Sequence, residues 1–122
     1  MNWLVSAGLV VAAVIHLLPV PGILGPDWLA RLYGVAIADP DMTIMMRHRA
    51  LLFGVLGLFM LAAAAKPEWQ APAAVAGLVS AAGFILLAWQ VGGYSPAIAR
   101  VVTADIVAVA ALLISGVGLV LS

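Results

Sequence analysis

The chain of 122 residues has a formal net charge of zero, no cysteine, 66% hydrophobic residues and a mean hydropathy of +1.25. About half of the residues of a soluble domain are apolar, so this composition indicates an integral membrane protein without a separate soluble domain. The balanced charge provides no basic field, and we therefore do not expect nucleic acid as a partner. The lack of cysteine excludes disulfides, thiolate zinc sites, iron–sulfur clusters and covalently attached c-type haem.

Four stretches of the sequence are long and apolar enough to cross a bilayer, for which a helix needs about 20 residues. The first stretch ends in "PVPG", where Pro19 and Pro21 lack the backbone N–H that a continuing helix requires. No basic region precedes this stretch, which favours a retained helix over a signal peptide. The sequence thus predicts an all-α membrane protein, a single antiparallel four-helix transmembrane bundle over residues 1–122, with spans at about 2–20, 42–65, 73–91 and 97–121.

The connections between the spans carry turn and helix-end signals. "GPDWLARLYG" predicts a short interfacial helix between the first and second spans, which begins at Pro26 and ends at Gly34. Asp41 is a suitable N-cap for the second span. "KPEWQAP" predicts a tight polar turn before the third span, and "GGYSPA" turns the chain into the fourth.

Positive charge predicts the orientation of the chain in the membrane. Arg31, Arg47, Arg49 and Arg100 lie in or beside the first and third connections, whereas Lys66 lies on the other side. The positive-inside rule places the arginine-rich connections in the cytoplasm. We therefore expect a multi-pass protein with both termini on the non-cytoplasmic side.

Polar side chains gather at the arginine-rich end of the predicted bundle, in one leaflet of the bilayer. Asp105 lies within an apolar span, where an aspartate costs about 2.5 to 3.5 kcal/mol on insertion scales. Arg100 projects about 140° away around the same helix, so we expect Asp105 to pair with a cation of another helix. The predicted ligand-binding residues at this end are His16, Arg47, His48, Arg49, Trp89, Gln90, Tyr94, Arg100 and Asp105.

The triplet "RHR" at residues 47–49 has two interpretations. In the first, both arginines anchor the helix at lipid phosphates. In the second, one arginine faces a pocket, where its guanidinium holds oxygen acceptors and His48 exchanges a proton near neutral pH. Arg47 and Arg49 project about 200° apart on a helix, so they cannot both face the bundle interior. We expect Arg49, which lies deeper along the span, to face inward.

Three functions are compatible with this pattern. The leading hypothesis is a one-leaflet pocket that binds an amphipathic ligand, either a quinone or an anionic lipid headgroup. A second is an accessory or structural subunit of a larger membrane complex, or a homodimer, held by helix faces rich in small residues. A third is a b-type haem protein, because His16 and His48 are the only histidines and lie on adjacent predicted spans. The pattern does not decide whether the protein is an enzyme, and it assigns no catalytic residue.

The segments "HLLPVPGILG", "LARLYGVAIADPDMTIMMRHRALLFGVLG" and "LLAWQVGGYSPAIARVVTADIVA" resemble small bacterial four-helix membrane proteins of the DoxX-like kind. The resemblance covers nearly the whole chain and implies a location in the bacterial inner (cytoplasmic) membrane. DoxX-like relatives are linked to quinone-coupled redox work, so the resemblance implies a quinone as one candidate cofactor. Some similar sequences carry the label phosphopantetheine adenylyltransferase, which this chain argues against because it has no HxGH motif, no P-loop and no α/β domain to hold ATP.

Overall fold

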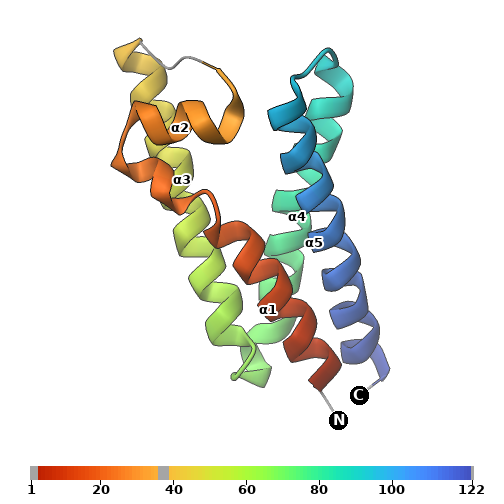
Figure 1. The fold of residues 1–122 in the computed structure, drawn as a ribbon. Helices are drawn as coiled ribbons and strands as arrows, with labels where there is room; N and C mark the ends of the chain where they lie inside the picture. The colour runs from red at the N-terminus through yellow and green to blue at the C-terminus, as the bar shows by residue number, and fades with distance from the viewer. Residues whose placement is uncertain (1–2, 36–38, 122) are drawn as a thin grey trace.

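The computed structural model describes residues 3–35 and 39–121. Within these ranges the elements are α1 (Trp3–Leu17), the 3₁₀ segment η1 (Val20–Leu24), α2 (Pro26–Tyr33), α3 (Pro40–Ala63), α4 (Pro67–Val91) and α5 (Pro96–Leu121). Four segments are long and apolar enough to cross a membrane, with α1 and η1 together forming the first. The long helices pack antiparallel, and the short helix α2 lies between the first and second spans (Figure 1), which confirms the predicted fold class.

The bundle is held together by close packing of small residues. The first helix, α1, packs against α5 and α3, and α4 packs against α5 and α3. A Cβ atom at Gly8 of α1 would lie 2.1 Å from Ser115 Oγ of α5, so only glycine allows these two helices to approach so closely. The buried cluster at the centre comprises Val5, Leu9, Ala12, Ala13, Met60, Ala63, Ala73, Ala74, Ala81, Ala108 and Leu112.

The first helix is much shorter than the other three spans, and this difference shapes one end of the bundle. It has 15 residues, whereas α3, α4 and α5 have 24, 25 and 26. At about 1.5 Å per residue, α1 is about 22 Å long and the others exceed about 35 Å. Pro19 follows the end of α1 closely and cannot supply a helical N–H. The long helices therefore continue past α1, and α2 lies beside them at the arginine-rich end.

The short helix α2 begins and ends where the sequence predicts. Pro26 occupies the first turn, and Gly34 caps the C-terminus in the left-handed conformation at φ 69°. Leu29 and Tyr33 are buried from this helix, packed against apolar side chains of α3 and α5. The hydroxyl of Ser95 also lies 3.5 Å from the carbonyl oxygen of Tyr33. Helix α2 is thus fixed across the end of the bundle by its apolar face.

Two predicted helix starts were wrong. Asp39, and not Asp41, is the N-cap of α3, because its carboxylate accepts a hydrogen bond from the Asp41 backbone N–H at 3.1 Å. The "KPEWQAP" segment is also not a turn, because α4 already begins at Pro67. Proline is favourable in the first helical turn, where its missing N–H would have no partner in any case.

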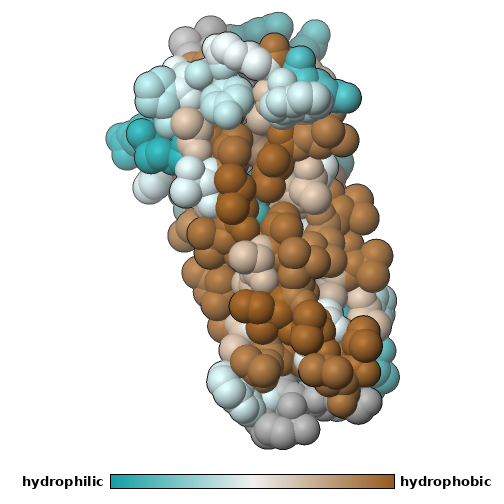
Figure 2. All heavy atoms as spheres, turned by 90° about the vertical axis from the view of Figure 1, so that its right-hand side faces the viewer, coloured by the Kyte–Doolittle hydropathy of each residue, from teal (hydrophilic) through white to brown (hydrophobic). Residues whose placement is uncertain are grey.

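The surface divides into an apolar body and polar ends. Figure 2 shows hydrophobic residues over most of the height of one face, with hydrophilic residues gathered at its upper end. Trp3, Trp28, Trp69 and Trp89 are exposed close to helix ends, where indole rings favour the membrane interface. Helix length, hydropathy and this distribution together describe a small multi-pass integral membrane protein.

Candidate functional site

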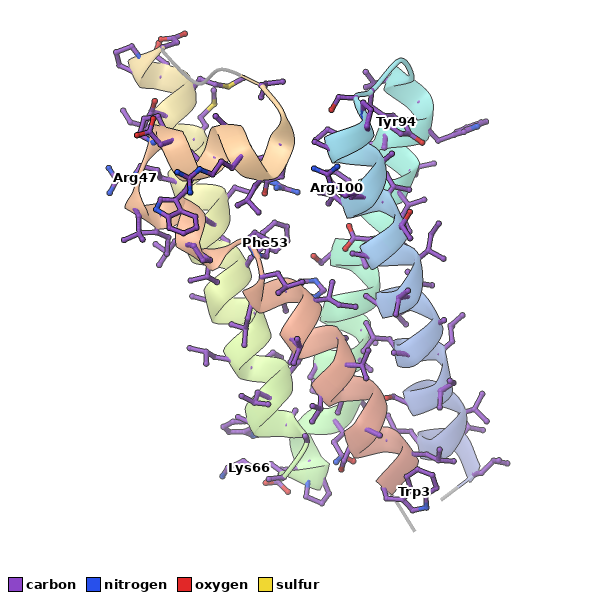
Figure 3. All side chains as sticks on the ribbon, viewed as in Figure 1. Trp3, Arg47, Phe53, Lys66, Tyr94 and Arg100 are labelled. Atoms are coloured by element: carbon purple, nitrogen blue, oxygen red, sulfur yellow. The ribbon has the colours of Figure 1, made fainter. Side chains whose placement is uncertain are left out.

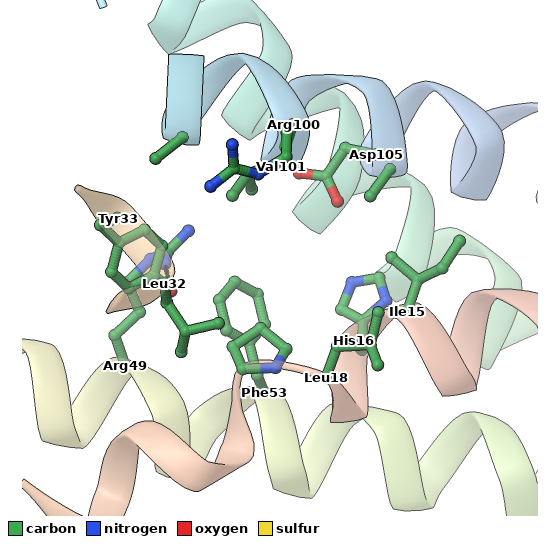
Figure 4. A pocket seen from close by; sticks show the side chains of 13 residues that line it. Ile15, His16, Leu18, Leu32, Tyr33, Arg49, Phe53, Arg100, Val101 and Asp105 are labelled. Carbon is green, nitrogen blue, oxygen red and sulfur yellow. Dashed lines mark hydrogen bonds between the residues drawn. The ribbon is translucent and has the colours of Figure 1, made fainter. Parts of the chain in front are cut away.

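A cavity lies at the arginine-rich end of the bundle, next to the point where α1 ends. Its volume is about 180 Å³. Because a cavity of about 150 Å³ is sufficient for benzene, this one is suited to a single ring or a group of similar size. The side chains that line it are Ile15, His16, Leu18, Pro19, Leu32, Tyr33, Arg49, Phe53, Ala97, Arg100, Val101, Ala104 and Asp105 (Figure 4).

Arg49 is half-buried in the cavity wall and is surrounded by aromatic rings. Its guanidinium donates a hydrogen bond to the Tyr33 hydroxyl oxygen. The guanidinium carbon also lies 5.2 Å from the ring centre of Tyr33, 4.5 Å from that of Phe53 and 5.1 Å from that of Phe84. Cation–π contacts stabilise a buried positive charge without a carboxylate partner. Arg49 therefore remains in the wall as an accessible donor.

Arg47 takes the opposite direction, as the helical spacing predicts. Its side chain is exposed, and its Nε donates to the Ile23 carbonyl oxygen at 2.7 Å. Figure 3 shows Arg47 on the outer side of the α2–α3 end, while Phe53 and Arg100 point toward the space between α3 and α5. The prediction that one arginine faces inward and the other outward is confirmed, with Arg49 as the inward one.

Asp105 stands on the other side of the cavity from Arg49. It is 9% exposed, and the described residues give its carboxylate neither a hydrogen bond nor an ion pair. The charge of Arg49 acts on it from a distance, and Figure 4 shows Arg49 and Tyr33 facing Asp105 and His16. The expected ion pair between Asp105 and a cation of another helix is therefore not formed, because Tyr33 and the aromatic rings hold the Arg49 guanidinium.

His16 closes the cavity at the end of α1 and has both ring nitrogens engaged. Nδ1 lies 2.8 Å from the Ala12 carbonyl oxygen and Nε2 lies 2.9 Å from Ser80 Oγ. A carbonyl oxygen only accepts, so Nδ1 carries the proton, and Nε2 of the neutral ring accepts from the serine hydroxyl. The imidazole also packs edge-on against Phe53 at 5.6 Å. His16 thus contributes its ring and leaves no free nitrogen.

Tyr33 supplies a second polar group to the wall that holds Arg49. Burial raises the pKa of its phenol, and the neighbouring guanidinium of Arg49 opposes that rise. Arg49 donates to the phenol oxygen, so the hydroxyl hydrogen of Tyr33 is not used in that contact. The hydroxyl is therefore a second donor beside the guanidinium.

The structure brings together only part of the predicted set. His16, Arg49, Arg100 and Asp105 line the cavity. The predicted residues that do not line it are Arg47, His48, Trp89, Gln90 and Tyr94, all of them exposed. Trp89 and Gln90 lie at the C-terminal end of α4, and Tyr94 lies in the connection that follows. The α4 residue that contacts Arg49 is Phe84, which precedes them along the helix.

The two histidines do not face a common space. His16 is buried with both nitrogens engaged, and His48 is exposed on α3 outside the cavity. Haem ligation by two imidazoles needs a free nitrogen from each, directed at one iron. The geometry therefore does not favour the haem hypothesis.

Two aromatic residues of the site were missing from the prediction. Phe53 follows Arg49 by four residues and so shares its face of α3, a spacing that could have identified it. Tyr33 reaches Arg49 only through the packing of α2 against α3. Spacing along one helix cannot predict such a contact between two elements.

Comparison with known proteins identifies no family for this chain. No family model, no curated protein and no solved structure matches this chain. The DoxX-like resemblance accordingly carries no family assignment.

Proposed function

We propose that this small integral membrane protein binds the polar head of an amphipathic molecule in the cavity beside α1. The observation that carries the proposal is that Arg49 and Asp105 open on one cavity within an apolar bundle and are not paired with each other. Polar groups inside a membrane protein are costly without partners, and they typically mark a ligand or a transport path. A bound polar head would supply partners for both groups.

The cavity volume limits what enters. Pockets for complete drug-sized ligands occupy about 300 to 1,000 Å³, whereas this cavity measures about 180 Å³. Only a head group fits inside, and an attached apolar chain would remain among the lipids. A haem macrocycle exceeds this space.

A single ring of the quinone class, oxidised or reduced, is the candidate that the walls favour. Its ring oxygens would accept hydrogen bonds from Arg49 and Tyr33, and its face would pack against Phe53 and the aliphatic lining. An anionic lipid headgroup is the second candidate, because Arg49 and Arg100 both line the cavity and guanidinium groups bind phosphate oxygens.

Binding in lipid nanodiscs distinguishes the two candidates. In the first experiment, wild-type protein in neutral lipid is titrated with decyl-1,4-benzoquinone. In the second, the neutral lipid is replaced by phosphatidylglycerol. Isothermal calorimetry and thermal unfolding are the readouts. Saturable quinone binding that phosphatidylglycerol does not displace supports the first candidate. Stabilisation by phosphatidylglycerol alone supports the second. A protein that responds neither to phosphatidylglycerol nor to the ring compound in its oxidised or reduced form contradicts the proposed function.

Replacing each arginine of the triplet by lysine tests whether the cavity is the binding site. Arg49→Lys should weaken quinone binding at least about tenfold, or about 1.4 kcal/mol, because lysine cannot reproduce the planar guanidinium fork. Arg47→Lys is the matched control, since its side chain lies outside the cavity. Equal dissociation constants for the two variants would place the binding site elsewhere.

A further inference from the structure

The two sides of the cavity differ in the hydrogen bonds that they can make. On the donor side, Arg49 and Tyr33 line the cavity, and their N–H and O–H groups are able to donate to a ligand. On the acceptor side, Asp105 presents a carboxylate to which the described residues give no hydrogen bond or ion pair. A head group that bridges the cavity therefore meets donors at one end and an acceptor at the other.

We propose that Asp105 makes the cavity selective for a head group that carries a hydroxyl, which donates its hydrogen bond to the carboxylate. Arg49 then donates to an oxygen at the opposite end of the ring. This inference rests on the proposed function and names the ligand form within it. The preferred form is a neutral hydroquinone or a similar phenolic ring, with Asp105 as the specificity-determining residue.

No other described side chain on this side of the cavity can take the place of Asp105, and the Tyr33 oxygen across the cavity already accepts from Arg49. His16 uses Nε2 to accept from Ser80 and Nδ1 to donate to Ala12. Arg100 is a donor without acceptor capacity and is exposed at the cavity. Asp105 is thus the acceptor that a hydroxyl of the ligand would meet.

The same geometry disfavours the two alternative head groups. A quinone has only acceptor oxygens, so one carbonyl would face the carboxylate with no hydrogen between them. A lipid phosphate would place its negative charge near that of Asp105, and like charges repel strongly at low dielectric. A site built around a ligand hydroxyl rejects an analogue that lacks it, because the polar group of the site is left unpaired.

Three ring compounds with the same chain test the inference. Decylhydroquinone, its dimethyl ether and decyl-1,4-benzoquinone are titrated anaerobically at pH 8 into wild-type protein in neutral nanodiscs. The hydroquinone should bind at least about tenfold more tightly than either analogue, because only its hydroxyl satisfies the carboxylate. Equal dissociation constants, or tighter binding of the quinone, would overturn the inference while leaving the proposed function intact. If none of the three binds, the inference fails, and the proposed function fails with it unless phosphatidylglycerol stabilises the protein.

Asp105→Asn tests which residue is responsible for the preference. An asparagine both donates and accepts, so the preference for hydroquinone over quinone should fall to within about twofold. Asp41→Asn is the matched control, because Asp41 is exposed near the start of α3 and lies outside the cavity. This control should keep the wild-type preference. If Asp105→Asn keeps the wild-type preference for hydroquinone over quinone, the role of Asp105 is overturned. If this variant does not fold, the dissociation constants of the three ring compounds for wild-type protein decide the inference.

Discussion

Arg49 shows how a charged residue can be held within an apolar bundle and remain usable. Three aromatic rings from three helices surround its guanidinium, and Tyr33 accepts one of its hydrogen bonds. Such contacts offset part of the cost of removing the charge from water without neutralising it. The opposing carboxylate of Asp105 consequently remains unpaired within the described chain.

The inward direction of Arg49 could be predicted from the sequence, but its partners could not. Helical geometry alone separates Arg47 from Arg49, and the structure confirms that separation. The expectation that Asp105 would pair with a neighbouring cation followed from the cost of an unpaired aspartate within an apolar span. It failed because aromatic side chains from α2, α3 and α4 compete for the same guanidinium, and their convergence depends on tertiary packing.

The Tyr33 phenol provides a test of the donor side of the cavity. Burial raises its pKa in the folded protein above the value of about 10 for a free phenol. As pH rises past about 10, the unfolded chain loses the phenol proton first, so folding stability should fall with increasing pH. The difference in tyrosinate absorbance between wild-type protein and Tyr33→Phe should show a transition above pH 10. Over the same pH range, the free energy of unfolding should fall less for Tyr33→Phe than for wild type. A difference transition below pH 10 would contradict the described burial.

Helix lengths explain why the cavity lies at one end of the bundle. The proline-rich segment stops α1 early, the long helices continue, and α2 covers part of the vacated space. A stop at the prolines and α2 itself could both be predicted, since proline and glycine mark their ends, but the shortness of α1 relative to α4 could not, because both spans were predicted at the same length. The start of α4 could not, because the polar residues between Lys66 and Pro72 are equally compatible with a turn and with an exposed first helical turn.

The position of α2 depends on Gly34. This residue has φ 69°, and a Cβ atom there would lie 2.8 Å from the Ala97 Cβ on α5. Gly34→Ala should therefore reduce the free energy of unfolding by at least about 1 to 2 kcal/mol. Gly83→Ala is the control, because a Cβ at Gly83 meets nothing within 4 Å and alanine favours a helix.

Denaturant unfolding in mild detergent measures both glycine variants. We expect a lower denaturation midpoint for Gly34→Ala and an equal or higher midpoint for Gly83→Ala. A Gly34→Ala protein as stable as wild type would show that the cap does not constrain α2.

At the scale of the whole molecule, composition and periodicity were sufficient to predict the bundle. Four apolar segments of membrane-spanning length leave few alternatives to antiparallel packing, and the structure has that arrangement. The selection of polar residues that meet in one cavity could not be predicted in the same way. Trp89, Gln90 and Tyr94 share a bundle end with the cavity but lie outside its lining, because membership of one leaflet does not determine the direction of a side chain.

The orientation of the molecule in the membrane is a further prediction. The start of α1 and the end of α5 lie at one end of the bundle, and α2 lies at the other (Figure 1). The cavity and the four arginines belong to the end that holds α2. The positive-inside rule then places the cavity end in the cytoplasm. Alkaline phosphatase fused to the carboxyl terminus should be active in a bacterial host, whereas green fluorescent protein fused there should be dark. The opposite pair of results would invert the topology.

The central claim, that the cavity beside α1 holds the head of the ligand, is tested most directly by filling that cavity. Ala104→Phe places a phenyl ring in the space proposed for the ligand, and Ala110→Phe places the same ring on the exposed face of the same helix. In nanodisc titrations with decylhydroquinone, Ala104→Phe should bind at least about tenfold more weakly than wild type, and Ala110→Phe within about twofold of it. Thermal unfolding should show both variants folded. Wild-type affinity in a folded Ala104→Phe protein would contradict the account.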